Sequence, residues 1–176
     1  MPKLYTIGHS THPLEDFIEI LHIYRITHLV DVRTVPKSRH VPWFNQSALT
    51  RSLCQERIAY SHIIKLGGLR KSKPDSINTG WRNKSFRGYA DYMQTRQFYE
   101  GLKELHSIIK HSEQAAIMCA EAVPWRCHRS LIGDAESIRH VEVIDILGKN
   151  SIRKHELTSF AVVDKSTRPY QIHYPK

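Results

Sequence analysis

Short apolar runs alternate with segments of helical periodicity along most of this chain, and this alternation constrains the fold more than any other feature. The runs predict strands at Leu4–Ile7, His28–Val32, Tyr60–Ile64, Ala115–Met118 and Glu142–Ile146. Helical patterns lie between them, at Leu14–Tyr24, Gln46–Arg57, Tyr89–Lys110 and Cys127–Ile138. Such alternation favours a mostly parallel sheet. We therefore predict an α/β fold, a single-domain three-layer structure with about five strands and helices on both faces.

The length of 176 residues suits one domain with its own core. We expect a single domain over 1–176, with a long basic loop at about 65–87 and a mixed basic tail from about 148. No apolar stretch approaches the roughly 20 residues of a membrane span, and we expect no signal peptide. Three cysteines in such a chain indicate reduced thiols. These features predict a cytoplasmic protein with no membrane partner.

The formal net charge of +9 favours an anionic partner, either a small molecule or a nucleic acid. The segment 65–87 adds to this, because it contains seven basic residues and one acidic residue. Trp81 and Phe86 lie among these charges and could stack on bases. A basic loop that is simply solvated explains the same composition.

The densest group of reactive side chains falls between the fourth predicted strand and the helix after it. Its members are Cys119, Glu121, Arg126, Cys127, His128 and Arg129. A thiolate of Cys119 or Cys127 could be the nucleophile, because a helix start and neighbouring cations stabilise it. Glu121 could instead act as a general base while the arginines hold an anion.

A Cys/His metal site is another interpretation of the same loop. It would use Cys119, Cys127 and His128, with His9 as a fourth candidate ligand, but two cysteines eight positions apart do not match a standard zinc spacing. In the plainest interpretation, Cys119 is a small buried side chain and Arg129 a surface charge. We assign no metal ligand, and the sequence identifies no cofactor.

Polar residues also follow the other strands, and ligands of open parallel sheets bind at the carboxyl ends of the strands. His9 and Ser10 follow the first strand, and Asp31 and Arg33 end the second. We therefore predict one shared site. Its catalytic candidates are Cys119, Glu121, Cys127, His128 and His9. Its substrate-binding candidates are Ser10, Asp31, Arg33, Arg87, Tyr89, Tyr92, Arg126 and Arg129.

The chain resembles the bacterial and archaeal family called domain of unknown function 488. The resemblance rests on blocks at Thr6–Thr11, Leu29–Arg33, Phe86–Met93, Met118–Glu121 and Cys127–Ile132, in the order of the family. It implies a small α/β fold with these blocks gathered at one site, and it implies no particular reaction.

The leading functional hypothesis is an enzyme that acts on a nucleotide, nucleic-acid or phosphorylated substrate at the Cys/Glu/Arg/His site. One alternative is a non-catalytic nucleic-acid-binding protein that uses the basic loop and tail. Another is a metal- or redox-dependent regulatory protein. The sequence does not identify the reaction or the oligomeric state.

Overall fold

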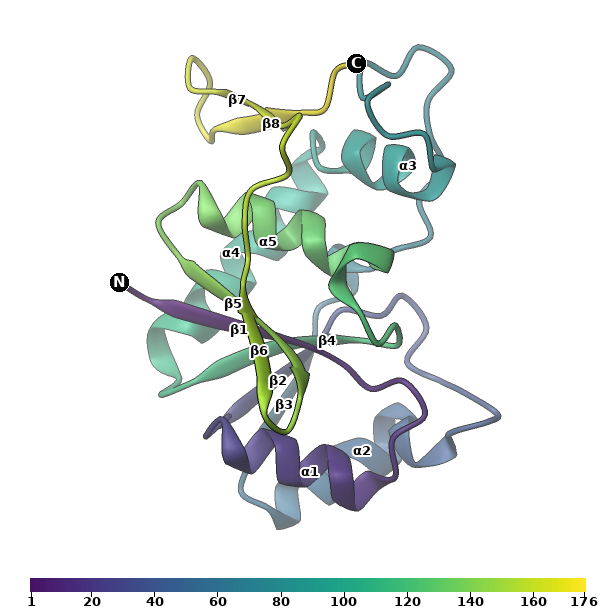
Figure 1. Ribbon diagram of the computed structural model, residues 1–176, viewed down its shortest axis with the longest axis vertical. Helices are drawn as coiled ribbons and strands as arrows, with labels where there is room; N and C mark the ends of the chain where they lie inside the picture. The colour runs from purple at the N-terminus through teal and green to yellow at the C-terminus, as the bar shows by residue number, and fades with distance from the viewer.

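A mixed six-stranded sheet forms the centre of the molecule, described over residues 1–176 by a computed structural model (Figure 1). Its strands follow the order β3-β2-β4-β1-β5-β6. Their bounds are Lys3–Gly8 (β1), His28–Asp31 (β2), Ala59–His62 (β3), Ala115–Cys119 (β4), Glu142–Gly148 (β5) and Ser151–Lys154 (β6). Neighbouring strands are parallel except for the antiparallel edge pair β5–β6. The predicted α/β class and mostly parallel sheet are confirmed.

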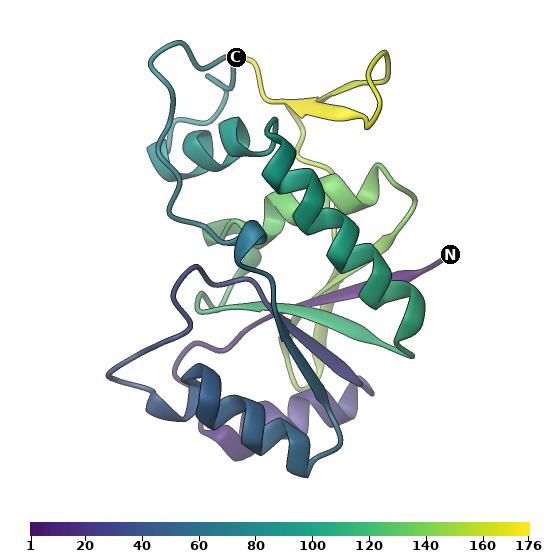
Figure 2. The same ribbon diagram turned by 180° about the vertical axis from the view of Figure 1, so that it is seen from behind.

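Helices lie on both faces of the sheet, as Figures 1 and 2 show. The helices are α1 (Leu14–Ile23), α2 (Gln46–Gln55), α3 (Lys84–Tyr92), α4 (Arg96–His111) and α5 (Arg129–Ser137). Helices α1 and α2 pack on one face through side chains such as Phe17 and Leu49. Helices α4 and α5 pack on the other face through side chains such as Phe98 and Leu131. The central strand β4 is buried along its whole length, because helices cover both of its faces.

The predicted helix over Tyr89–Lys110 is wrong, since two helices occupy this region. Helix α3 begins earlier, where the Asn83 side chain accepts hydrogen bonds from two amides of the first turn. The chain then turns, and α4 begins where the Thr95 hydroxyl accepts from the Phe98 amide at 3.4 Å. An apolar pattern that continues across both helices hides such a break, whereas the capping side chains mark it.

The C-terminal segment forms a hairpin of β7 (Val162–Asp164) and β8 (Gln171–His173). Beside it, Trp81 stacks on Phe86 with ring centroids 4.9 Å apart, and it also contacts Phe160 and Tyr174. The two aromatic side chains of the basic loop therefore pack against the tail of the chain. None of the helices is long and apolar enough to cross a membrane.

Candidate functional site

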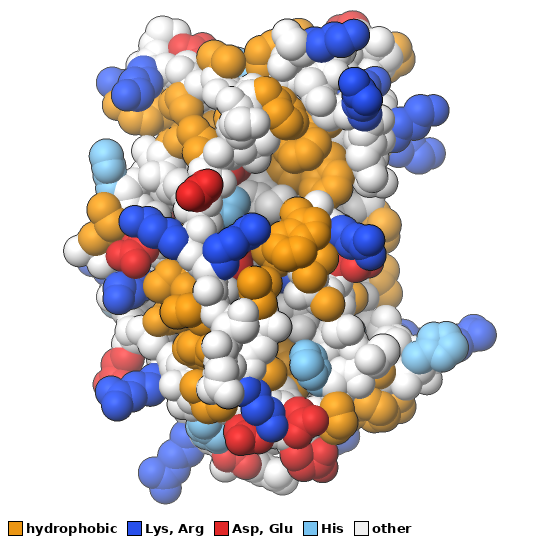
Figure 3. Space-filling model, in the orientation of Figure 1, with side chains coloured by type: hydrophobic (Ala, Val, Ile, Leu, Met, Phe, Trp, Pro, Cys, Tyr) orange, Lys and Arg blue, Asp and Glu red, His pale blue; other side chains and the backbone are white.

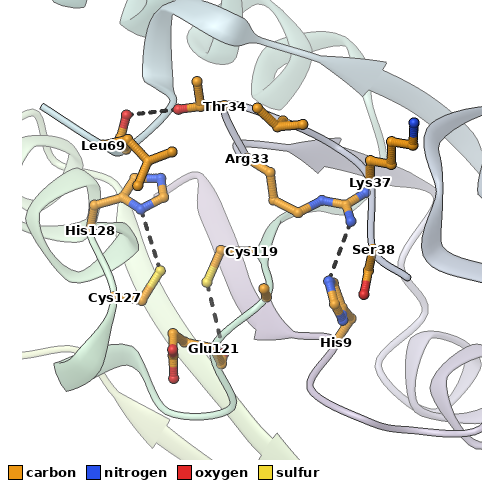
Figure 4. A pocket seen from close by; sticks show the side chains of 13 residues that line it. His9, Arg33, Thr34, Lys37, Ser38, Leu69, Cys119, Glu121, Cys127 and His128 are labelled. Atoms are coloured by element: carbon orange, nitrogen blue, oxygen red, sulfur yellow. Dashed lines mark hydrogen bonds between the residues drawn. The ribbon is translucent and has the colours of Figure 1, made fainter. Parts of the chain in front are cut away.

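A pocket of about 340 Å³ opens at the carboxyl ends of β1, β2 and β4 (Figure 4). Its volume lies in the range of sites for small molecules. The structure brings six of the predicted site residues to this pocket: His9, Arg33, Cys119, Glu121, Cys127 and His128. All of the predicted catalytic side chains therefore border one cavity.

Gly8, at the end of β1, allows the loop after β4 to approach closely. The amide of His9 donates to the carbonyl of Cys119 at 2.9 Å. A Cβ atom on Gly8 would lie 1.6 Å from the carbonyl oxygen of Glu121, so the backbones could not meet with any larger residue. This contact holds the cysteine loop directly against the residues that follow β1.

Arg129, the first residue of α5, is fully buried beneath the pocket. Its Nε donates to Cys119 Sγ at 3.1 Å, and its Nη1 donates to the Thr6 hydroxyl at 2.8 Å. Its Nη2 donates to the carbonyls of Glu121 and Ala122 at 2.8 and 3.1 Å. None of these acceptors is a carboxylate. A buried cation is costly without an anion, and Cys119 is the only ionisable side chain among its acceptors. The guanidinium therefore favours the thiolate form of Cys119.

The two cysteines of the pocket have opposite pKa shifts. Burial raises the pKa of Cys119, but a hydrogen bond from Cys127 and the charge of Arg129 outweigh it and bring that pKa to about 7. Burial and the neighbouring Cys119 raise the pKa of Cys127 well above its usual value. Near neutral pH the pair thus holds a thiol on Cys127, while Cys119 is about half thiolate.

Arg33 enters the pocket from the end of β2 as half of a buried ion pair. Its Nε and Nη2 donate to the two oxygens of Asp31 at 2.9 and 2.7 Å. Nη2 also donates to the Phe44 carbonyl at 2.8 Å, and Nη1 donates to His9 Nε2 at 3.3 Å. A guanidinium has five N–H donors. One N–H of Nη1 is therefore left without an acceptor in the protein and can bind an oxygen of a ligand.

Both histidines of the pocket are neutral rings whose tautomers follow from their partners. His9 Nδ1 donates to the Ser10 carbonyl at 2.8 Å, which leaves Nε2 as an acceptor. His128 Nε2 donates to the Val32 carbonyl at 2.9 Å, which leaves Nδ1 as an acceptor 3.5 Å from Cys127 Sγ. Burial lowers the pKa of both rings, to about 4 for His128. Near neutral pH each ring can therefore accept a proton at one defined atom.

Tyr89 and Tyr92, predicted to bind substrate, lie behind the pocket wall. Their hydroxyls donate to the carbonyls of Leu66 and Lys65 at 2.8 and 2.6 Å. These bonds fix the turn that leads to Gly68, which borders the pocket. The two tyrosines thus support the site from outside.

Four other predicted ligands are placed beside the pocket or away from it. Asp31 is fully buried behind Arg33, and Ser10 lies next to the pocket without lining it. Arg87 borders a separate surface depression near the C-terminus, and Arg126 is exposed in the short 3₁₀ helix before α5. The predicted site therefore divides into a pocket, its buried support and two outlying arginines.

Sequence reasoning missed part of the pocket wall. Thr34, Lys37 and Ser38 border it from the loop after β2, and Leu69 borders it from the turn after β3. Their position after the carboxyl ends of strands was the signal that could have identified them.

Thr6 and Asp145, the hydrogen-bonded residues behind Arg129, were also not identified from the sequence. The Thr6 hydroxyl that accepts from Arg129 donates in turn to Asp145 Oδ1 at 2.6 Å. A carboxylate in the middle of an apolar strand is uncommon, so Asp145 could have been singled out from its place in β5.

No group of three or more His, Cys, Asp or Glu side chains is placed to hold a metal ion. Fold and pocket together define an α/β protein with a mostly parallel sheet and two buried cysteines at the strand ends. The chain belongs to the family described as domain of unknown function DUF488, whose model matches residues 13–135. The resemblance predicted from the sequence is confirmed, and the matched range contains every pocket residue except His9. Among curated proteins and solved structures, none matches the chain.

Proposed function

We propose that the protein is an enzyme in which the thiolate of Cys119 attacks an electrophilic centre of a small anionic substrate held in the pocket. The contact between Arg129 Nε and Cys119 Sγ, at 3.1 Å, carries this proposal. It supplies a buried cation whose only ionisable acceptor is the thiol, and this is a known way to activate a cysteine nucleophile.

Arg33 and Lys37 would recognise the negative charge of the substrate. Arg33 offers one free N–H at the pocket wall, and the ammonium group of Lys37 is exposed at the pocket edge. Glu121 is exposed on the same rim and could exchange a proton with the reacting group. Because the chemistry needs reduced thiols, we place the protein in the cytoplasm.

Alkylation by a matched pair of reagents tests both the reactivity of the Cys119 thiolate and the preference of the pocket for an anion. Iodoacetamide is neutral and iodoacetate is anionic, and both react with thiolates. We expect Cys119 to react with a midpoint near pH 7 and to prefer iodoacetate relative to Cys54, the exposed cysteine on α2. The substitution Lys37→Gln should lower this preference and leave the midpoint unchanged. Faster labelling of Cys54 than of Cys119 at pH 7 would contradict the proposal.

Nucleic acid is a second candidate partner, because four exposed basic side chains form no ion pair within the protein. Lys71, Lys73, Arg82 and Lys84 are exposed, and none of them forms an ion pair. On the face shown in Figure 3, Lys and Arg side chains are spread widely, with several close together near α3. Such charges bind phosphates with an affinity that falls steeply with salt.

Binding of a single-stranded RNA at several salt concentrations tests this candidate. If it is correct, the variant Lys71→Gln/Lys84→Gln should bind less tightly and show a shallower salt dependence than Cys119→Ser, which should bind as the unmodified protein does. Affinity that is unchanged in the lysine variant would exclude this surface.

A further inference from the structure

Cys119 and Cys127 lie near each other at one end of the pocket. Cys119 ends β4 and Cys127 lies two residues before α5. Figure 4 shows the two side chains at the same end of the pocket, with the sulfur of Cys127 directed toward His128 and that of Cys119 toward Glu121. Both side chains are buried in the protein yet border the pocket, with exposed fractions of 2% and 5%. The two thiols lie near enough that each shifts the pKa of the other, downward for Cys119 and upward for Cys127.

The single proton of the Cys127 thiol has two possible acceptors. One is the sulfur of Cys119, and the other is Nδ1 of His128 at 3.5 Å. His128 can accept because its Nε2 proton is committed to the Val32 carbonyl. Cys127 can therefore stabilise a thiolate on Cys119 and, once that sulfur has reacted, pass its proton to His128.

The His128 ring is held in this position by its surroundings. A Cβ atom on Gly68 would lie 2.9 Å from His128 Nδ1, so the absence of a side chain there leaves room for the ring. The ring of Tyr89 packs against it with centroids 4.9 Å apart. The base beside Cys127 is therefore fixed before any substrate binds.

We propose that Cys119 and Cys127 are the attacking and resolving thiols of an exchange reaction that reduces a small disulfide carrying a negative charge. The proposal rests on the proposed function, because it uses the same nucleophile and the same pocket. It adds the reaction type and the substrate class. Arg33 and Lys37 would hold the charged group of the disulfide.

The exchange balances without any further oxidant. The thiolate of Cys119 attacks one substrate sulfur, the S–S bond of the substrate breaks, and the first substrate thiolate leaves with the electron pair. His128 Nδ1 then takes the proton of Cys127, whose thiolate attacks the sulfur of Cys119 and releases the second half of the substrate. That half leaves with the proton from His128 as a thiol. Two electrons have passed to the substrate, and the protein holds a Cys119–Cys127 disulfide that a dithiol in solution can reduce.

Two small disulfides of similar size and opposite charge test this inference. Dithiodiglycolate carries carboxylates and cystamine carries ammonium groups. Reduced full-length protein is mixed with each, and disulfide-linked peptides are identified by mass spectrometry over time. With dithiodiglycolate we expect a Cys119–Cys127 link, formed about tenfold faster than with cystamine. Cys127→Ser should stop with half of the substrate bound to Cys119, and Cys54→Ser should behave as the unmodified protein does.

Three results would overturn the inference. The first is a stable mixed disulfide on Cys119 in the unmodified protein, because Cys127 would then not resolve it. The second is an equal or faster reaction with cystamine, and the third is a Cys119–Cys127 link that only hydrogen peroxide produces. If iodoacetamide still labels Cys119 at pH 7 in any of these cases, the proposed nucleophile stands and only the exchange reaction fails. If it does not, the proposed function fails as well.

Discussion

Two clusters of ionisable side chains are linked by Arg129, which bonds to Cys119 of the first and, through the Thr6 hydroxyl, to Asp145 of the second. The clusters differ in their access to solvent and in the pairing of their charges. The pocket cluster contains Cys119, Cys127 and His128 and opens to solvent. The second cluster lies deeper, where His155 Nε2 is 2.8 Å from Asp134 Oδ1 and its Nδ1 is 3.8 Å from Asp145 Oδ2.

In the deeper cluster each carboxylate has a cationic or hydroxyl partner. Although burial lowers it, the hydrogen bond to Asp134 and the nearby charge of Asp145 raise the pKa of His155 to about 9. The imidazolium therefore bonds to Asp134 and lies 3.8 Å from Asp145. The hydroxyls of Tyr174 and Thr158 also donate to Asp134. In the pocket cluster, by contrast, Cys119 is the only ionisable acceptor of the buried Arg129 guanidinium. The two clusters are thus similarly dense in ionisable groups and differ in solvent access, and the proposed reactivity of the pocket cluster rests on that access and on the pairing of Cys119 with Arg129.

Removal of Arg129 should have the largest effect, because its fully buried guanidinium makes four hydrogen bonds, one of them to Cys119. In Arg129→Met the pKa of Cys119 should rise above that of a free cysteine, because burial raises it and the guanidinium no longer lowers it. The rate of its reaction with iodoacetamide at pH 7 should then fall by about 50-fold or more. The free energy of unfolding should fall by about 3 kcal/mol, since buried acceptors lose their donor. Urea denaturation and alkylation rates measure the two effects.

Arg126→Met, which changes an exposed arginine of the same loop, is the matched control and should alter neither quantity. If Arg129→Met does not fold, Arg129→Lys keeps the charge with fewer donors and should raise the midpoint of Cys119 alkylation by a smaller amount. A midpoint that stays near pH 7 in a folded Arg129 variant would show that this guanidinium does not activate the thiol.

The deeper cluster should be revealed by the dependence of stability on pH. The pKa of His155 is raised to about 9 in the folded protein, so its contribution is fully present below about pH 6.5 and is lost as pH rises through 9. It amounts to about 3 kcal/mol. The pKa of Cys119 is lowered, so its contribution has the opposite sign and grows as pH rises above 7.

His155→Asn should therefore remove the loss of stability that comes from His155 as pH rises, and it should leave the gain that comes from Cys119. The difference in unfolding free energy between the unmodified protein and this variant should shrink as pH rises from 6.5 to 9, measured by urea denaturation. The exposed His111 provides the control variant His111→Asn, for which the difference should stay constant. A constant difference for His155→Asn would mean that the imidazolium is not paired in the folded state.

The sequence predicted the layers of the fold because the apolar runs are governed by burial. All five strands found from these runs belong to the parallel part of the sheet, while the edge strand β6 was missed. The residues of β6 are all exposed, so no apolar pattern marks them. The break between α3 and α4 was missed for a different reason, because the apolar positions of both helices face the same core.

The sequence also predicted which strand ends contribute to the pocket. It did not predict how deeply each side chain is buried. Arg33 and Arg129 have the same side chain and both follow a strand, yet one borders the pocket and the other lies beneath it. Depth depends on where α5 packs and on close backbone approaches such as that at Gly8. Such tertiary distances leave no local pattern in the chain.

A smaller effect should follow from filling the space at Gly68. In Gly68→Ala the new methyl group would press on His128 Nδ1, move the ring and lengthen its contact with Cys127. We expect Cys119 alkylation to be nearly unchanged and release of the mixed disulfide to slow several-fold. The control Gly148→Ala places a methyl group where no atom lies within 4 Å and should change neither rate. Unchanged release in Gly68→Ala would show that His128 does not assist Cys127.

Glu121→Gln should have the smallest effect on alkylation and on stability, because Glu121 supports the pocket through its backbone. Its carbonyl accepts from Arg129, and this bond survives the substitution, while its exposed carboxylate adds negative charge at the rim and exchanges no proton during alkylation. Loss of that charge should speed the reaction of Cys119 with iodoacetate by about twofold and leave the rate with iodoacetamide unchanged. Unfolding free energy should change by less than about 0.5 kcal/mol. If turnover of an anionic disulfide falls more than about tenfold while both alkylation rates persist, the Glu121 carboxylate takes part in proton transfer, and the reactive cluster extends from the buried thiols to the rim.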